Sequence, residues 1–131
     1  MYTMFLTVDP EDERPIYRQL ADGIKALIAR GALREGMTLP SVRQVAGDLD
    51  VNLNTVAAAY RQLQEESFVR VRHGAGAVVA SRRARGIDDD RLRTPLRTAL
   101  TQLVLAGLSD RDIAAMVRQE LAPLRGKGNL E

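Results

Sequence analysis

Residues 39–80 read LPSVRQVAGDLDVNLNTVAAAYRQLQEESFVRVRHGAGAVVA, and they contain the clearest structural pattern in the chain. Around the small Ala46, apolar residues have the spacing of two short helices that cross closely and share one seam: Val45, Leu49, Val51 and Val56. Asp50 lies where the turn between the helices favours a left-handed backbone, which aspartate tolerates better than most residues. The stretch therefore predicts a helix-turn-helix, with helices over about 42–49 and 53–65.

Capping residues support the start of each helix. Ser41, with Gln44 three residues on, has the pattern of a capping box directly after Pro40. Asn52 is a natural N-cap for the second helix. These local signals agree with the apolar spacing.

A β-hairpin is predicted directly after the second helix. Residues 68–72 (FVRVR) alternate apolar and basic side chains, which is typical of a strand with one wet face. Residues 73–76 (HGAG) form a glycine-bearing turn, and 77–80 the returning strand. Such a wing would hold Arg70 and Arg72 beside a duplex, and its glycines would let the backbone approach phosphate closely. A structural hairpin with solvated arginines is the alternative.

A supporting helix is predicted before the two helices. Pro15 suits the first turn of a helix and Gly31 suits its end. Apolar residues recur between them at helical spacing: Ile16, Leu20, Ile24, Leu27 and Ile28. Residues 32–40, which contain Gly36 and Pro40, are expected to form a loop.

Residues 81–90 (SRRARGIDDD) read as a linker to two amphipathic helices. Gly107 ends the first of these, Ser109 caps the second with Asp112 at the third position, and Pro123 begins a frayed polar tail. Two short helices so rich in leucine cannot bury both faces alone, so we predict a dimer interface. Its residues are Leu92, Leu96, Leu100, Leu103, Val104, Leu108, Ile113, Met116, Val117 and Leu121.

The predicted fold is thus mainly α with a small β-hairpin wing. A winged helix-turn-helix DNA-binding domain would occupy residues 1–82, and a linker with a short C-terminal two-helix dimerisation module residues 83–131. A chain of 131 residues suits one small domain with such an appendage.

Composition narrows the classes of function. The chain has no cysteine, which excludes disulfides and thiolate metal sites. It shows no apolar run of membrane-spanning length and no signal-peptide pattern, so we expect a cytoplasmic protein. His73, the one histidine, has no partner at a ligand-like spacing, and no nucleophile–base set, paired acids or phosphate loop is recognisable. We therefore expect neither an enzyme nor a metal or cofactor site.

The second helix is the expected reader of DNA. Helix-turn-helix proteins place the N-terminal part of this helix in the major groove, where Asn54 can pair with an adenine edge and Thr55 can reach a base or phosphate. Capping alone is the alternative role for these two residues. The predicted DNA-binding set is Ser41, Arg43, Asn52, Asn54, Thr55, Arg61, Arg70, Arg72, His73, Gly74 and Gly76. The charge balance, 19 Lys/Arg against 17 Asp/Glu, neither supports nor opposes DNA binding.

The order PIYRQL, LPSVRQVA, NLNTVAAAYRQL and HGAG resembles the GntR family of bacterial transcription regulators over roughly residues 10–80. The short two-helix tail resembles the YtrA-like subfamily, whose members lack large effector-binding domains. The resemblance implies a homodimer on a palindromic operator, with Arg43 contacting DNA and the HGAG segment at the wing tip. Leu53 and Ala57 stand where several family members carry DNA-contacting arginines, so base readout here must differ from theirs.

Two functions follow from these patterns. The first is a homodimeric, sequence-specific DNA-binding transcriptional regulator, with repression as the expected mode. The alternative is a winged-helix protein–protein interaction module without DNA binding, which the small basic excess and the alanine-rich helix face motivate. A small-molecule effector, if there is one, is expected in the crevice between the winged domain and the two-helix tail.

Overall fold

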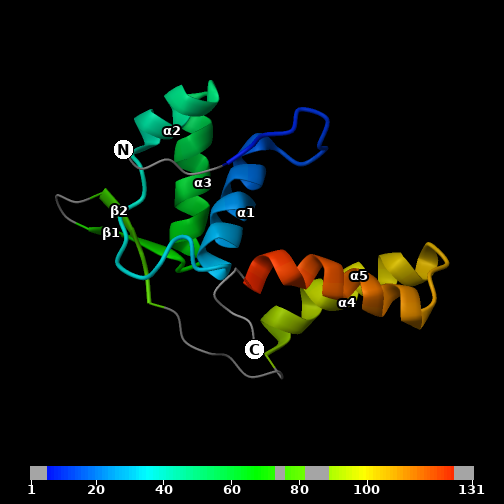
Figure 1. The fold of residues 1–131 in the computed structure, drawn as a ribbon. Helices are drawn as coiled ribbons and strands as arrows, with labels where there is room; N and C mark the ends of the chain where they lie inside the picture. The colour runs from blue at the N-terminus through cyan, green and yellow to red at the C-terminus, as the bar shows by residue number, and fades with distance from the viewer. Residues whose placement is uncertain (1–5, 73–75, 82–88, 126–131) are drawn as a thin grey trace.

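The computed structural model describes residues 6–72, 76–81 and 89–125. Five helices and one hairpin follow one another along the chain: α1 (Ile16–Ala29), α2 (Val42–Leu49), α3 (Leu53–Glu65), β1 (Val69–Arg72), β2 (Gly76–Val79), α4 (Asp90–Leu105) and α5 (Asp110–Arg125). Figure 1 shows α1, α2 and α3 gathered with the hairpin on one side, while α4 and α5 lie apart from it. The predicted fold class, mainly α with a hairpin wing, is confirmed.

The core of the winged domain (α1–α3, β1 and β2) forms between α1 and α3, which pack against each other, with α2 packed on α3. The predicted apolar face of α1 supplies Leu20 and Ile24, and α3 supplies Val56, Ala59 and Leu63, all at most 1% exposed. Burial of such side chains is the main stabilising contribution to a small domain. The core therefore fixes the orientation of α3, whose opposite face is left to solvent.

The segment before α1 also contributes to this core. Leu6 is buried, and a Cβ added at Gly23 of α1 would lie 2.8 Å from its Cδ2 atom. Gln19 ties the same segment to the helix: its Oε1 accepts a hydrogen bond of 2.9 Å from the Asp9 N–H. Gly23 is thus needed because the N-terminal segment crosses α1 closely.

Residues 32–40 contain no helix or named strand, in agreement with the predicted loop, but the second half of the loop pairs with β2. Thr38 forms an antiparallel bridge with Val78 of β2. The Leu39 N–H donates to the Ala77 carbonyl, and the Val79 N–H donates to the Met37 carbonyl, both at 2.9 Å. β2 therefore pairs with β1 on one side and with this segment on the other, which fixes the base of the wing beside the start of α2.

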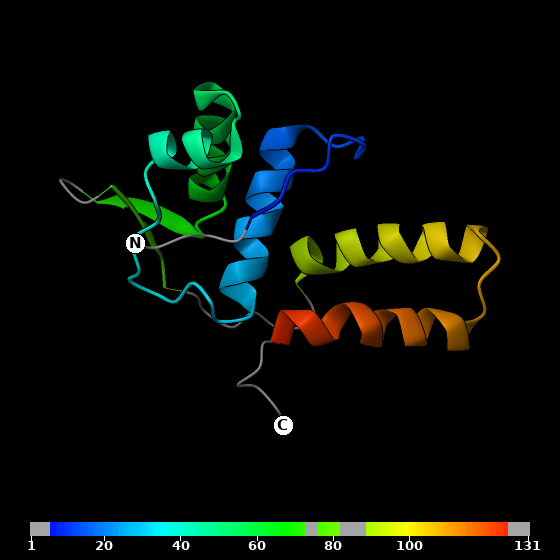
Figure 2. The ribbon, with the colours of Figure 1, turned by 45° about the horizontal axis from the view of Figure 1, so that its top comes forward.

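The helices α4 and α5 form an antiparallel hairpin, as the two views together show (Figures 1 and 2). The end of α5 lies next to α1, which is its contact with the winged domain. Ser109 caps α5 as predicted, because its Oγ accepts a hydrogen bond of 3.2 Å from the Asp112 N–H. Pro123 does not begin the polar tail: it lies inside α5, which continues to Arg125. Within the ranges described, no helix has both the length and the apolar character needed to cross a bilayer.

Candidate nucleic-acid interface

The turn between α2 and α3 has the predicted geometry. Asp50 closes α2 in the left-handed region, with φ 56° and ψ 48°, and its N–H donates to the Ala46 carbonyl. The Val51 N–H donates to the same carbonyl at 3.1 Å. The left-handed residue reverses the chain within two positions, which brings the start of α3 directly after the end of α2.

Both predicted caps are present. Ser41 Oγ accepts from the Gln44 N–H at 3.0 Å, and Asn52 Oδ1 accepts from the Asn54 N–H at 2.7 Å. Ser41 and Asn52 remain exposed, so the Ser41 hydroxyl proton and the Asn52 amide protons can still be donated. Such donors at helix N-termini are well suited to phosphate oxygens.

The cap at Asn52 leaves the side chain of Asn54 available. Among the described residues, neither the Asn54 carboxamide nor the exposed guanidinium groups of Arg43 and Arg61 make a hydrogen bond or an ion pair. Thr55 is half-buried. The structure thus opposes the reading in which Asn54 serves only as a cap, since Asn52 has that role. Asn54 can offer a donor and an acceptor to a base edge.

The wing is described only in part. Arg70 is exposed on β1, and the backbone of Arg72 pairs with Gly76. Gly76 adopts φ +72° as the first residue of β2, so the returning strand begins one residue earlier than predicted. The side chain of Arg72, and His73 and Gly74 as a whole, lie outside the described residues, so their predicted contacts with DNA stay predictions.

A hollow of about 620 Å³ lies between α3, the wing and the start of α2. Its wall brings together three of the predicted DNA-binding residues: Ser41, Arg61 and Gly76. Tyr60 also lines it and donates a hydrogen bond of 2.6 Å to the Pro40 carbonyl. This bond could not be predicted from the sequence, because its acceptor at Pro40 is twenty positions away and no local pattern indicates it.

At the other end of α3 an ion pair joins the helix to α1. Lys25 Nζ lies 2.7 Å from Glu66 Oε1 and 5.6 Å from the centre of the Phe68 ring. Partial burial raises the pKa of Glu66, but the hydrogen bonds from Lys25 and Gln62 outweigh it, and the pKa is lowered overall. The lowered pKa favours the ionised form of Glu66, and its ion pair with Lys25 holds the end of α3 against α1.

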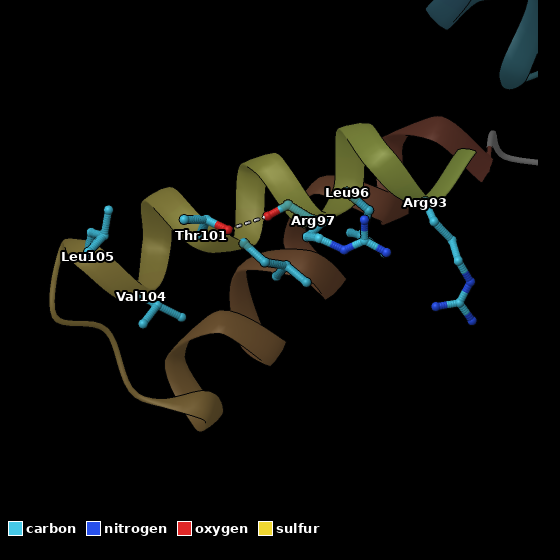
Figure 3. A pocket seen from close by; sticks show the side chains of 7 residues that line it. Arg93, Leu96, Arg97, Thr101, Val104 and Leu105 are labelled. Carbon is cyan, nitrogen blue, oxygen red and sulfur yellow. Dashed lines mark hydrogen bonds between the residues drawn. The ribbon is translucent and has the colours of Figure 1, made fainter. Parts of the chain in front are cut away.

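The predicted dimer interface is mostly exposed in the single chain. Leu96 and Val104 line a shallow groove of about 370 Å³ along α4, with Arg93 and Arg97 at one end (Figure 3). Leu92, Met116, Val117 and Leu121 are also exposed, while Leu100, Leu103 and Leu108 are half-buried. Ile113 is a correction, because it is only 9% exposed and so packs within the hairpin instead of facing a partner.

The crevice predicted for an effector has no counterpart in these two cavities. One lies along α4 and the other lies within the winged domain. An effector site between the winged domain and the tail therefore stays a prediction.

Comparison with known proteins agrees with this geometry. The model of the gntR family of bacterial regulatory proteins matches residues 16–79, from α1 to the end of β2. The transcriptional repressor YtrA of Bacillus subtilis is 27% identical over 125 residues, which are 92% of this chain and 95% of the relative. The match therefore includes most of the two-helix tail as well as the winged domain.

Two solved structures share the fold. A transcriptional antiterminator from Listeria monocytogenes has a TM-score of 0.85 at 27% identity, with 97% of each chain covered. YtrA from Sulfolobus acidocaldarius, a GntR-family transcription factor, is 40% identical with a TM-score of 0.61, over 73% of this chain and 97% of that one. These matches over motif, wing and tail show that the chain belongs to the GntR family of bacterial transcription regulators.

Proposed function

We propose that this DNA-binding transcriptional regulator acts as a homodimeric repressor on a palindromic operator in the cytoplasm. The observation that carries the proposal is the exposed start of the helix-turn-helix. There, Arg43 and Asn54 are free of partners among the described residues, on helices that caps and core hold in place. Because the helices are already in place, binding to phosphates and base edges needs only the side chains to become ordered.

Binding to an operator is sufficient for repression when the operator overlaps a promoter. The Bacillus subtilis relative that aligns with most of the chain is a transcriptional repressor. A chain of this size can block a promoter by binding an operator that overlaps it, without any catalytic step. The protein-interaction module considered from the sequence loses its support, because the whole helix-turn-helix and wing match a family of regulators.

Dimerisation through the tail would give the two-fold symmetry that a palindrome requires. The groove on α4 combines apolar side chains with two arginines, and Leu96, Val104 and Leu105 are 53%, 60% and 81% exposed, which leaves apolar surface for a partner to cover. Two copies joined there would present two α3 helices to half-sites roughly 34 Å apart, about one turn of the duplex.

The test is binding to the DNA upstream of the protein's own gene, measured by fluorescence anisotropy over a range of salt concentrations. We expect selective binding that weakens steeply with salt, because the arginines displace counterions from phosphates. Replacing Arg43 or Asn54 by alanine should cost about 1–3 kcal/mol of specific binding.

Arg30→Ala is the matched control. Arg30 is an exposed arginine at the end of α1, so this substitution removes the same charge as Arg43→Ala. It should bind as the wild type does. Arg43→Ala and Asn54→Ala variants that bind as tightly as Arg30→Ala would contradict the site. Equal affinity for upstream and unrelated DNA would contradict the prediction that the operator lies upstream of the protein's own gene.

A further inference from the structure

The first residue of α3 is an exposed leucine. Leu53 directly follows the N-cap Asn52 and is 44% exposed, and it precedes the exposed Asn54. A single exposed leucine on an ordinary surface needs no explanation. The N-terminal turn of a recognition helix is different, because it is the part that enters the major groove.

The helix surface next to Leu53 is also apolar, and it carries only a short side chain. Residues i and i+4 lie on the same side of a helix, so Ala57 stands one turn beyond Leu53, and Arg61 one turn beyond Ala57. Ala57 is half-buried and carries a single methyl group. The first two turns of this side therefore offer hydrocarbon to whatever lies opposite, and the first cation follows only at Arg61.

Apolar contact is selective among the base edges. The major-groove edges of guanine, adenine and cytosine present acceptors or donors, whereas thymine adds a C5-methyl group. A leucine pressed against an acceptor or donor would displace its water without replacing the hydrogen bond, which is unfavourable. Against a methyl group the same contact removes apolar surface from water on both partners.

We propose that Leu53, with Ala57 beside it, reads the C5-methyl group of one thymine in each operator half-site. This specificity rests on the proposed DNA-binding function and adds a contact that carries no hydrogen bond. It predicts a sequence preference at a position where an arginine would favour guanine.

The experiment begins with selection of tight-binding sites by the full-length protein from a library of random duplexes. Each thymine of the selected site is then replaced by deoxyuridine, which removes the methyl group and keeps every hydrogen-bonding group. Replacement of one thymine per half-site should weaken binding by the wild type about three- to fivefold, the effect of one buried methyl group. Replacement at the other thymines should change binding less than twofold.

The variant Leu53→Ala should bind the thymine and deoxyuridine duplexes with equal affinity. Leu124→Ala is the matched control, because Leu124 is a leucine of α5 in the tail, 40% exposed, and belongs neither to the groove on α4 nor to the predicted dimer interface. It should retain the wild-type dependence on the methyl group. The difference between the two variants isolates the contact from any general effect of losing an exposed leucine.

The outcomes separate the two ideas. If the wild type selects no sequence and binds all duplexes alike, the proposed function fails. If it selects a site but tolerates deoxyuridine everywhere, or if Leu53→Ala keeps the methyl dependence, then the reading by Leu53 is overturned and the DNA-binding function stands.

Discussion

The winged domain and the tail hairpin (α4 and α5) use helices of similar length but bury them very differently. In α1, with 14 residues, Leu20 and Ile24 are almost fully buried. In α4, with 16 residues, Leu96 is 53% exposed and Val104 is 60% exposed. Among the described residues of the tail, Ile113 alone belongs to the buried set.

This difference indicates two sources of stability. The winged domain has a core of its own, in which helices and hairpin cover one another. Two helices that leave most of their apolar residues in water gain little from packing, and short isolated helices are marginal. The tail therefore depends on α1 and, under our proposal, on a second copy. The comparison predicts that mutations will affect folding in one part and assembly in the other.

The largest effect is expected from charge in the tail groove. The double variant Leu96→Asp and Val104→Asp would place two unpaired carboxylates in the proposed interface, where desolvating a charge costs several kcal/mol. We expect the dimer to weaken about 1,000-fold, or roughly 4 kcal/mol. Analytical ultracentrifugation measures the dissociation constant of the dimer. The winged domain of the double variant should unfold at the same urea concentration as in the wild type. Thr98→Asp, on the same helix but outside the groove, is the control, and a double variant that stays dimeric would reject this interface.

The next largest effect is expected from a cavity in the core of the winged domain. Leu63 is fully buried in α3, and Leu63→Ala should destabilise the winged domain by about 2–5 kcal/mol in urea unfolding, from lost burial and the cavity left behind. The matched Leu105→Ala in the tail should change the same free energy by less than about 0.5 kcal/mol. Similar values for the two leucines would remove the distinction between the parts.

The helix caps give a finer comparison, because both parts contain caps whose side chains accept a backbone N–H. Asn52→Ala should destabilise the winged domain by about 1 kcal/mol. Ser109→Ala removes the corresponding bond from α5 and should leave the unfolding of the winged domain unchanged. An equal loss from both variants would mean that the tail and the winged domain unfold as one unit.

The smallest effect concerns pH. The pKa of Glu66 is lowered in the folded protein, so its pairing with Lys25 stabilises fully above the ordinary glutamate pKa, and the stabilisation is lost as pH falls through the lowered value. Both groups are partly exposed, so we expect less than about 1 kcal/mol. Glu66→Gln should be less stable than the wild type at pH 7 and should approach it in acid. A difference that does not change with pH would exclude ionisation of Glu66 as its source.

Local signals in the sequence predicted the helix-turn-helix closely. The bounds of α2 and α3 agree with the prediction, because Ser41, Asp50 and Asn52 each determine one helix end through a hydrogen bond or a backbone angle close by. The left-handed residue was identified for the same reason. Where structure depends on neighbours in the chain, residue type and spacing are sufficient.

Contacts between distant residues were missed. The bridge of Thr38 with Val78 joins positions forty apart, and the packing of Leu6 against Gly23 depends on how the N-terminal segment crosses α1. The burial of Ile113 depends on how the two tail helices pair. For the DNA-binding residues, the sequence indicated their types and approximate face and predicted Asn52 as the cap; the structure adds that the Asn54 side chain has no partner among the described residues.

The bridge of Thr38 with Val78 also connects the wing to the helix-turn-helix, the two parts that we expect to contact DNA. The segment that pairs with β2 continues directly into Pro40, which accepts the Tyr60 hydroxyl, and into Ser41, the cap of α2. A displacement of the wing is therefore transmitted to the helix that supports α3. We expect the losses of affinity caused by variants of Arg70 on the wing and of Arg43 on α2 to be non-additive. Specificity would then depend on the wing and the helix-turn-helix together.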